Sequence, residues 1–338
     1  MIANLMLNTE MVNFARAMIF QSGSPANDPA FPASHRQTDW DNFVRAVPGC
    51  ADALANSASL DCLRTAEASA LVDAIVISTE EATELFPWAP TLDGPGGVIP
   101  DLPSNLLKAG DFAQLPFIAG DVLDEGTVFT PSSTDSTETI RNALVANYSM
   151  STEPTPALEG AIDRILELYP DIAALGSPYN TGNETFGLSS QFKRYAAAFG
   201  DLFFISHRRA LSHTAIDLGI KSFGYIFTEP PPPSLGAPPF FGVFHAVDEN
   251  YLFGRLAAEN GSAAALHLAE VIIDYWLSFT TSLDPNDGLG AKRPHWPEYT
   301  SETQVLMQLN GENTSVISDN FRAEGISFIN ANPVLFRR

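Results

Sequence analysis

The sequence predicts an α/β fold with a mostly parallel central sheet. Short apolar runs with the length of buried strands recur along the chain, and long segments with helical periodicity separate them. Strands joined by helical connections pair in parallel, because each helix returns the chain to the same end of the sheet. No internal repeat is visible.

Four apolar runs predict strands of this sheet. They are 15–21 (ARAMIFQ), 115–121 (LPFIAGD), 221–227 (KSFGYIF) and 304–310 (QVLMQLN). The first run ends in the turn-forming stretch SGSPANDP.

Helices are expected between these runs. The segments with helical periodicity are 2–8, which begins without an N-cap, 41–74, a short helix closed by 106–110, then 136–148, 155–169, 186–218 and 263–279. Two Pro-rich and Gly-rich segments, 86–103 and 229–239, are expected to be irregular. We interpret 229–239 as an extended surface connection, with a proline-recognition partner as the alternative.

The charge of the chain excludes one class of partner. Against 18 basic residues stand 40 acidic ones, and the net charge is −22. Nucleic acids are polyanions, so this chain would repel them, and it has no basic stripe to release their counterions. We therefore predict that it does not bind nucleic acid.

No segment of the sequence predicts a membrane span or a secretory signal. The longest apolar stretch, 263–279, is interrupted by His267, Glu270 and Asp274 and indicates an amphipathic helix. The first twenty residues lack a charged start, a compact apolar centre and a small-residue cleavage site.

Cys50 and Cys62 are the only cysteines. Without a Cys-x-x-Cys motif or a nearby pair of histidines, a zinc site is not expected, and either a small disulfide loop or two buried thiols remain. Four Asn-x-Ser/Thr sequons would suit a glycosylated secreted protein, although chance alone produces several; they begin at Asn147, Asn183, Asn260 and Asn313.

A cluster of carboxylates follows the second predicted strand. In GDVLDEGTVF, residues 120–129, Asp121, Asp124 and Glu125 stand within five positions. Like charges this close resist joint ionisation, and the carboxyl end of a parallel strand is where ligands bind. The spacing does not fit a calcium-binding EF-hand. The alternative is that Asp121 or Glu125 only caps the following turn.

Among the six histidines, His245 is the candidate for chemistry. It ends the apolar run FFGVF and comes 120 residues after Glu125. His207 and His213 lie six apart on a predicted helix, share no face, and are expected at the surface. His35, His267 and His295 stand in ordinary polar, helical or Pro-rich surroundings.

An acid followed much later by a histidine is the order Ser…Asp/Glu…His of α/β-hydrolases. A nucleophile in a Gly-x-Ser-x-Gly elbow should then precede residue 120. No serine of the chain has glycine at both flanking positions, and Gly94 to Gly97 is not a convincing oxyanion loop.

Several motifs, in a fixed order, resemble type-B carboxylesterases and lipases, most closely fungal lipases of the Candida rugosa (geotrichum-like) group. They are FARAMIFQSGSP, CADALANSASLDCLR, PWAPTLDGPGGVIPDLP, LPFIAGDVLDEGTVF, QFKR, FGVFHAVDENYLFG and HWPEYTSETQ, and they span nearly the whole chain. The resemblance implies one incomplete α/β-hydrolase domain over 1–338.

The resemblance also implies roles for individual residues. Glu125 in DEGT matches the triad acid, and His245 in VFHAVD matches the base. Val128 and Phe129 match positions that border the acyl pocket. The family's disulfide loop matches Cys50 and Cys62, which implies a secreted parent protein. The expected substrate is a small ester or a lipid, and no cofactor or metal is implied.

In this family the nucleophilic serine lies just before the helix that matches residues 2–8, so we expect the chain to correspond to the later part of such an enzyme and to be inactive alone. Without its partner strand we also expect it to be poorly soluble or molten. The alternative function is a non-catalytic binding or adhesion module of the same fold. Asp121, Asp124, Asp248 and Glu249 are expected to shape the surroundings of the acid and base, with at least two of them solvated.

Overall fold

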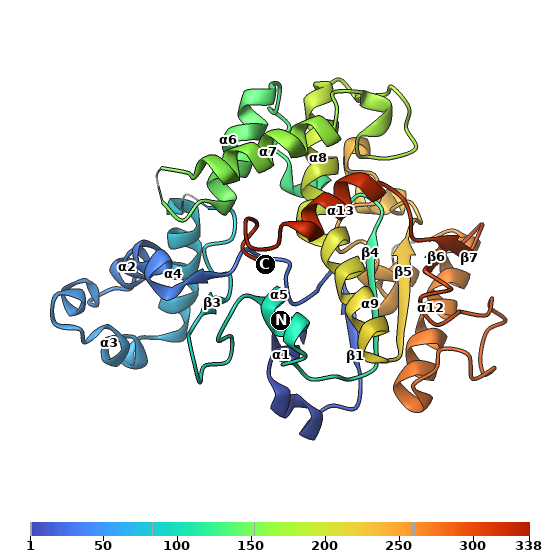
Figure 1. The fold of residues 1–338 in the computed structure, drawn as a ribbon, viewed down its shortest axis with the longest axis horizontal. Coiled ribbons are helices and arrows are strands. Elements are labelled where there is room, and N and C mark those ends of the chain that lie inside the picture. The colour runs from blue at the N-terminus through green and yellow to red at the C-terminus, as the bar shows by residue number, and fades with distance from the viewer. Residues whose placement is uncertain (1, 83, 152, 259–260) are drawn as a thin grey trace.

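The protein has a central sheet of five strands in the order β1-β4-β5-β6-β7 (Figure 1). The computed structural model describes residues 2–82, 84–151, 153–258 and 261–338. The strands are β1 (Met18–Gln21), β4 (Phe117–Val122), β5 (Ser222–Phe227), β6 (Val305–Leu309) and β7 (Ser315–Ser318). The first four are parallel and β7 is antiparallel to β6. The mostly parallel α/β fold is thus confirmed.

Helices fill most of the connections. Their bounds are α1 (Ile2–Met6), α2 (Gln37–Ala46), α3 (Ser59–Thr65), α4 (Ala68–Glu81), α5 (Pro103–Ala109), α6 (Thr137–Tyr148), α7 (Pro156–Leu168), α8 (Ser190–Gly200), α9 (Ser206–Leu218), α10 (Glu249–Leu252), α11 (Arg255–Ala258), α12 (Ala263–Ser282) and α13 (Ala323–Ala331). Of the two segments predicted to be irregular, 86–103 contains the two-residue strand β3 (Thr91–Leu92), which pairs with β2 (Phe31–Pro32).

Alternation along β4 sends its side chains to two different cores. Phe117 and Ala119 pack with Leu211 and Ala215 of α9, on one face of the sheet. Ile118 and its same-face neighbours pack with the apolar side of α12 on the other face. Both faces of the sheet are therefore covered, as Figure 1 shows for α9 and α12, and the six residues of β4 are all buried.

The long helical segment predicted over 186–218 is two helices joined by a π-helical turn. α8 starts one residue after Ser189, whose side chain accepts a hydrogen bond from the Gln191 amide. Residues 201–205 then form the π turn before α9. The expectation that His207 is at the surface is wrong: it is buried, and its Nε2 lies 2.5 Å from the Leu202 carbonyl oxygen. The helix is packed on all sides at His207, so this side chain has no face open to solvent.

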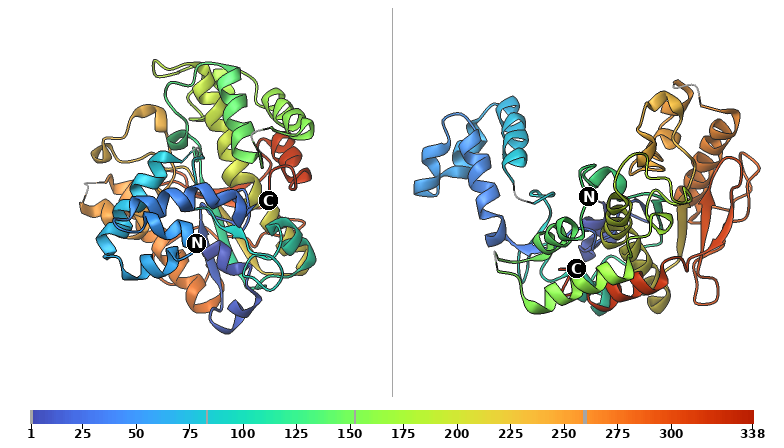
Figure 2. Two further views of the ribbon diagram at one scale, coloured as in Figure 1. Left: turned by 90° about the vertical axis from the view of Figure 1, so that its left-hand side faces the viewer. Right: turned by 90° about the horizontal axis from the view of Figure 1, so that it is seen from above.

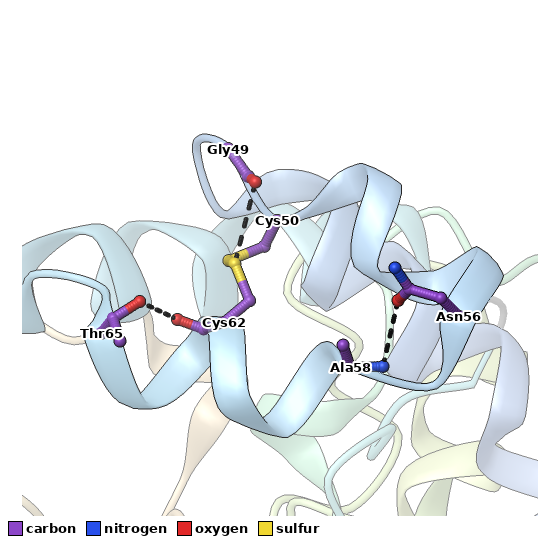
Figure 3. Close-up of a disulfide and its surroundings, with 6 residues drawn as sticks. All are labelled: Gly49, Cys50, Asn56, Ala58, Cys62 and Thr65. Carbon is purple, nitrogen blue, oxygen red and sulfur yellow. Dashed lines mark hydrogen bonds between the residues drawn. A yellow bond between two sulfur atoms is a disulfide. The ribbon is translucent and has the colours of Figure 1, made fainter.

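Helices α2, α3 and α4 stand out to one side of the sheet (Figure 2). Their own small core contains Phe43, Val44 and Leu63, and Cys50 is buried within it. A disulfide joins Cys50 to Cys62 on α3 (Figure 3). Of the two possibilities that the cysteine spacing left open, the disulfide is the one the structure has.

Candidate active site

The carboxylate of Glu125 lies buried in the loop that follows β4. One oxygen, Oε1, accepts hydrogen bonds from the Val122 amide at 2.8 Å and from the Ser22 hydroxyl at 2.6 Å. Gly126 lets this loop rest directly on α8, because a β-carbon there would overlap the Ala196 carbonyl oxygen. The side chain of Glu125 is therefore fixed from β1 and from its own loop.

His245 meets the other oxygen of Glu125. Its Nδ1 lies 2.6 Å from Glu125 Oε2, and the imidazole is 29% exposed. Burial acts to lower the pKa of His245, but the charge and hydrogen bond of Glu125, helped by Asp248 and Asp121, outweigh it and raise the pKa above its usual value. The two residues predicted as acid and base from positions 120 apart are thus in direct contact.

Asp124 fastens the loop of the acid to the loop of the base. Its Oδ2 accepts the Val243 amide at 2.9 Å, its own amide donates to the Val243 carbonyl at 3.0 Å, and Asp124 and Phe244 form a parallel β-bridge. Its Oδ1 accepts from the Ser177 hydroxyl and the Tyr179 amide, both at 2.8 Å. Burial nonetheless raises the pKa of Asp124 to about 6.

Gly242 makes this close approach possible. A β-carbon at this position would overlap the Asp124 carboxylate, and the residue has φ of +57°. Only glycine fits both conditions without strain. The sequence drew attention to Asp124 as part of an acidic cluster, but it gave no sign that the carboxylate joins the two loops.

Ser22 is a functional neighbour that sequence reasoning missed. Like the other serines of the chain, it does not have glycine at both flanking positions, which argues against a nucleophile. In the structure it follows β1 with φ of +51°, and its amide donates to the Gly120 carbonyl at 2.8 Å. This left-handed backbone turns its hydroxyl onto Glu125. A serine directly after a predicted strand was the available signal.

The remaining carboxylates of the cluster are also buried. Asp121 is bonded to Arg208 at 3.2 Å, and Asp248 accepts from Gln21 and Tyr225, each at 3.1 Å. Burial raises the pKa of both aspartates. The expectation that at least two of the four neighbouring acids are solvated is wrong, since only Glu249 is exposed.

An apolar wall stands beside the imidazole. The ring centroids of Phe129 and Phe204 lie 5.2 Å and 4.9 Å from that of His245. The same two rings, with Phe86, Ser22 and His245, line a cavity of about 230 Å³. Val128, the second residue predicted for an acyl pocket, is half-buried and is not among the residues that line this cavity.

This arrangement can transfer a proton. Because His245 Nδ1 faces a carboxylate, its proton is held there, and Nε2 is the nitrogen that carries the lone pair. Such an imidazole accepts a proton from a hydroxyl and stays stabilised as an imidazolium by the carboxylate. Within the described residues no group of three His, Cys, Asp or Glu side chains could hold a metal ion, and no helix is long and apolar enough to cross a membrane.

The sequence profile of the carboxylesterase family matches residues 1–329. Curated relatives include lipase 2 of Geotrichum candidum, 30% identical over 91% of this chain and 51% of its own length. A secreted lipase 1 of Botryotinia fuckeliana is 32% identical over 94% of this chain and 52% of its own length. The chain thus spans about half the length of the curated relatives it matches.

A solved structure shares the fold. The crystal structure of Aspergillus niger EstA superposes on 100% of this chain and 62% of its own, with a TM-score of 0.76 and 20% sequence identity. At this identity the likeness supports the α/β-hydrolase fold and nothing more specific.

Proposed function

Since this chain belongs to the carboxylesterase family, we propose that it supplies the acid and the base of a Ser-Glu-His triad in a carboxylic ester hydrolase. The observation that carries the proposal is the 2.6 Å contact between His245 Nδ1 and Glu125 Oε2. His245 is the general base and Glu125 holds its tautomer and stabilises the imidazolium. The nucleophilic serine comes from outside these 338 residues, because none of their serines stands in a Gly-x-Ser-x-Gly elbow.

In this mechanism the serine hydroxyl attacks the ester carbonyl while His245 Nε2 accepts the hydroxyl proton. The imidazolium then returns the proton to the leaving alkoxide, and an acyl-enzyme remains for water to hydrolyse in the same way. Members of a triad act as a unit, so the 338-residue chain alone has negligible activity. No cofactor takes part in these steps.

The aromatic wall beside His245 favours an acyl group of hydrocarbon character. Phe129 stacks on Phe199 and Phe204, with ring centroids 5.4 and 5.7 Å away, and faces the imidazole. Such a surface binds apolar chains by removing them from water. We propose esters of fatty acids or smaller acids as the substrate class, with Phe129 and Val128 bordering the acyl site, in one secreted α/β-hydrolase domain.

The test begins with the transcript upstream of residue 1. An in-frame Gly-x-Ser-x-Gly followed by turnover of a p-nitrophenyl ester supports the enzyme. In that complete protein, His245→Ala and Glu125→Gln should each lower kcat by about 10³-fold or more. His267→Ala is the matched control, because this histidine is half-exposed on α12 and should leave kcat unchanged.

The rival function is a binding or adhesion module that has lost its chemistry. Such a module has no need of a buried Glu-His pair, and the pair present here argues against it. An upstream sequence without a serine elbow would decide for the rival, whereas full activity after His245→Ala would overturn the proposed triad.

A further inference from the structure

A second cavity lies away from His245, between the end of α7, the start of α13 and α8. It has a volume of about 410 Å³. Its walls combine hydrocarbon surface with two arginines, Arg194 of α8 and Arg322, which precedes α13. The hydrocarbon surface comes from five residues: Leu168, Pro170, Ala174, Leu175 and Ala197. Neither arginine takes part in the proposed chemistry.

Arg194 is a buried cation that contacts only neutral oxygens. Its guanidinium donates to the carbonyl oxygens of Tyr169 and Leu166, to Thr137 and to Gln191. No carboxylate of the described residues forms a salt bridge with it. Asp171 makes no direct contact with it: Gln191 stands between them and donates to Asp171 at 2.8 Å, so the carboxylate acts on Arg194 only from a distance. A buried charge without a counter-ion is costly, and an anion in the cavity would reduce that cost.

Asp201 partly neutralises the charge of Arg322, and one nitrogen of its guanidinium remains available to bind a ligand. Its Nε and Nη2 donate to the two oxygens of Asp201 at 2.6 and 2.7 Å. The guanidinium lies over the Tyr179 ring, 4.3 Å from its centroid, and the backbone of Arg322 is held at φ of +46°. Its third nitrogen, Nη1, makes no hydrogen bond to the residues that the structure describes, so it can still receive a ligand oxygen.

The charges around the cavity favour a single negative charge. Asp201 balances Arg322, and Glu324, on the rim, is paired with Arg164 at 2.8 Å. Of the charged side chains that line the cavity, Arg194 is the one that no salt bridge among the described residues neutralises. A guanidinium matches the planar oxygens of a carboxylate, whereas a dianionic phosphate would also meet Asp201 and Glu324.

From this geometry we propose that the cavity binds a small organic carboxylate carrying a hydrocarbon chain, with its head group at Arg194 and Arg322. The chain lies on Leu168, Leu175 and Ala197. This inference does not rest on the proposed esterase function, because neither Glu125 nor His245 lines this cavity, which shares no lining residue with the cavity beside His245.

The probe for this site is octanoate. Its binding to the 338-residue chain is measured by isothermal titration calorimetry. We expect one octanoate per chain, with 1-octanol, acetate and octylammonium each binding at least tenfold more weakly. Leu175 lines the cavity and is 58% exposed, so Leu175→Glu should fold normally and weaken octanoate at least tenfold. Leu175→Gln, which keeps the shape without the charge, should weaken it less.

Ile172→Glu is the matched control, because Ile172 is 50% exposed, three residues away, and does not line the cavity. It should leave octanoate binding unchanged. Absence of binding, equal effects of the two Glu variants, or equal affinity for octanol would overturn the proposal. Loss of binding with Phe129→Ala but not with Leu175→Glu would assign octanoate to the cavity beside His245, which contradicts this inference and leaves the proposed function standing.

Discussion

Glu125 is held by three partners, two of which lie more than 100 residues away in the chain. The Ser22 hydroxyl and the Val122 amide bind one oxygen, and His245 binds the other. Each hydrogen bond fixes the orientation of the carboxylate. The imidazole therefore faces an acid that cannot rotate away from it.

The first prediction concerns the pKa of His245. We expect Glu125→Gln to lower it, because the charge that raises it is removed. The folded-state pKa lies above the unfolded value of about 6.5. The pair therefore stabilises the fold fully below pH about 6.5, and this contribution is lost as pH rises through the folded pKa. Titration of the imidazole resonances by NMR measures the change, and an unmoved His245 would contradict it. The exposed His267 is the internal control.

A second prediction separates the hydroxyl of Ser22 from its backbone. Ser22→Ala removes a donor to a buried carboxylate and should cost about 1 to 3 kcal/mol of unfolding free energy. Ser22→Gly loses the same donor, but glycine adopts φ of +51° freely, so it should be less destabilised than alanine by about 1 kcal/mol. Urea denaturation compares the variants. If alanine equals the wild type, the bond from Ser22 to Glu125 contributes nothing to stability.

At the scale of elements, Asp124 determines how the loop after β4 meets the segment that contains His245. Its carboxylate accepts three hydrogen bonds from Ser177, Tyr179 and Val243. All three partners lie far from it in the chain and belong to two segments, so the carboxylate joins three segments. Its burial is compensated by these donors only in part, since the pKa is still raised to about 6.

That raised pKa gives a third prediction. A carboxyl whose folded pKa exceeds its unfolded value of 3.8 stabilises most below pH 3.8, and this stability is lost as pH rises through about 6. Relative to Asp124→Asn, the wild type should therefore lose up to about 3 kcal/mol between pH 4 and 8. Chemical denaturation across this range tests it, with the exposed Asp135→Asn as control. A pH-independent difference would show that Asp124 titrates normally.

The disulfide stabilises α3 and its surroundings and is not part of the candidate active site. It links residues separated by 12 positions, and closing so short a loop contributes about 3 kcal/mol. We expect the Cys50→Ala/Cys62→Ala double variant to raise amide hydrogen exchange in α2, α3 and α4. Exchange around Glu125 and His245 should not change. Faster exchange throughout the chain would mean that this segment is not a separate unit of stability.

The elements that the sequence predicted are those with strong apolar runs or periodicity, such as β4 and α12. β7 was missed because it is a short edge strand whose side chains are half-buried or exposed, so its pattern is weak. α13 was missed because it follows directly on Arg322 in a left-handed conformation, without a capping side chain. The π turn at 201–205 is too short to change the hydrophobic periodicity of the segment, so the sequence does not predict it.

For the whole molecule, the pairing of Glu125 with His245 could be predicted from the order of acid and histidine in α/β-hydrolases and from the family resemblance. The role of Asp124 and the cavity at Arg194 could not, because both depend on loops whose paths no local pattern determines. The carboxylesterase family likeness identified the acid and base, but composition alone excluded only nucleic acid.

The last prediction concerns association of the 338-residue chain. β1 is an edge strand, and the residues before it expose apolar side chains, with Phe14 79% exposed. An open edge beside apolar surface favours pairing with another chain. We expect light scattering after gel filtration to show oligomers that Phe14→Lys reduces. Leu289→Lys, at an equally exposed residue far along the chain, should have no effect. A monomer with one sharp thermal transition would refute this.

The Pro-rich segment that leads to His245 is secured at both ends. Thr228 is bonded to β6 through the Leu309 carbonyl, and Val243 is bonded to Asp124. Between them Ser234 and Gly236 face solvent. The stretch is thus a natural insertion point: an epitope or a dye-labelled peptide grafted after Gly236 should leave the position of the His245 imidazole unchanged.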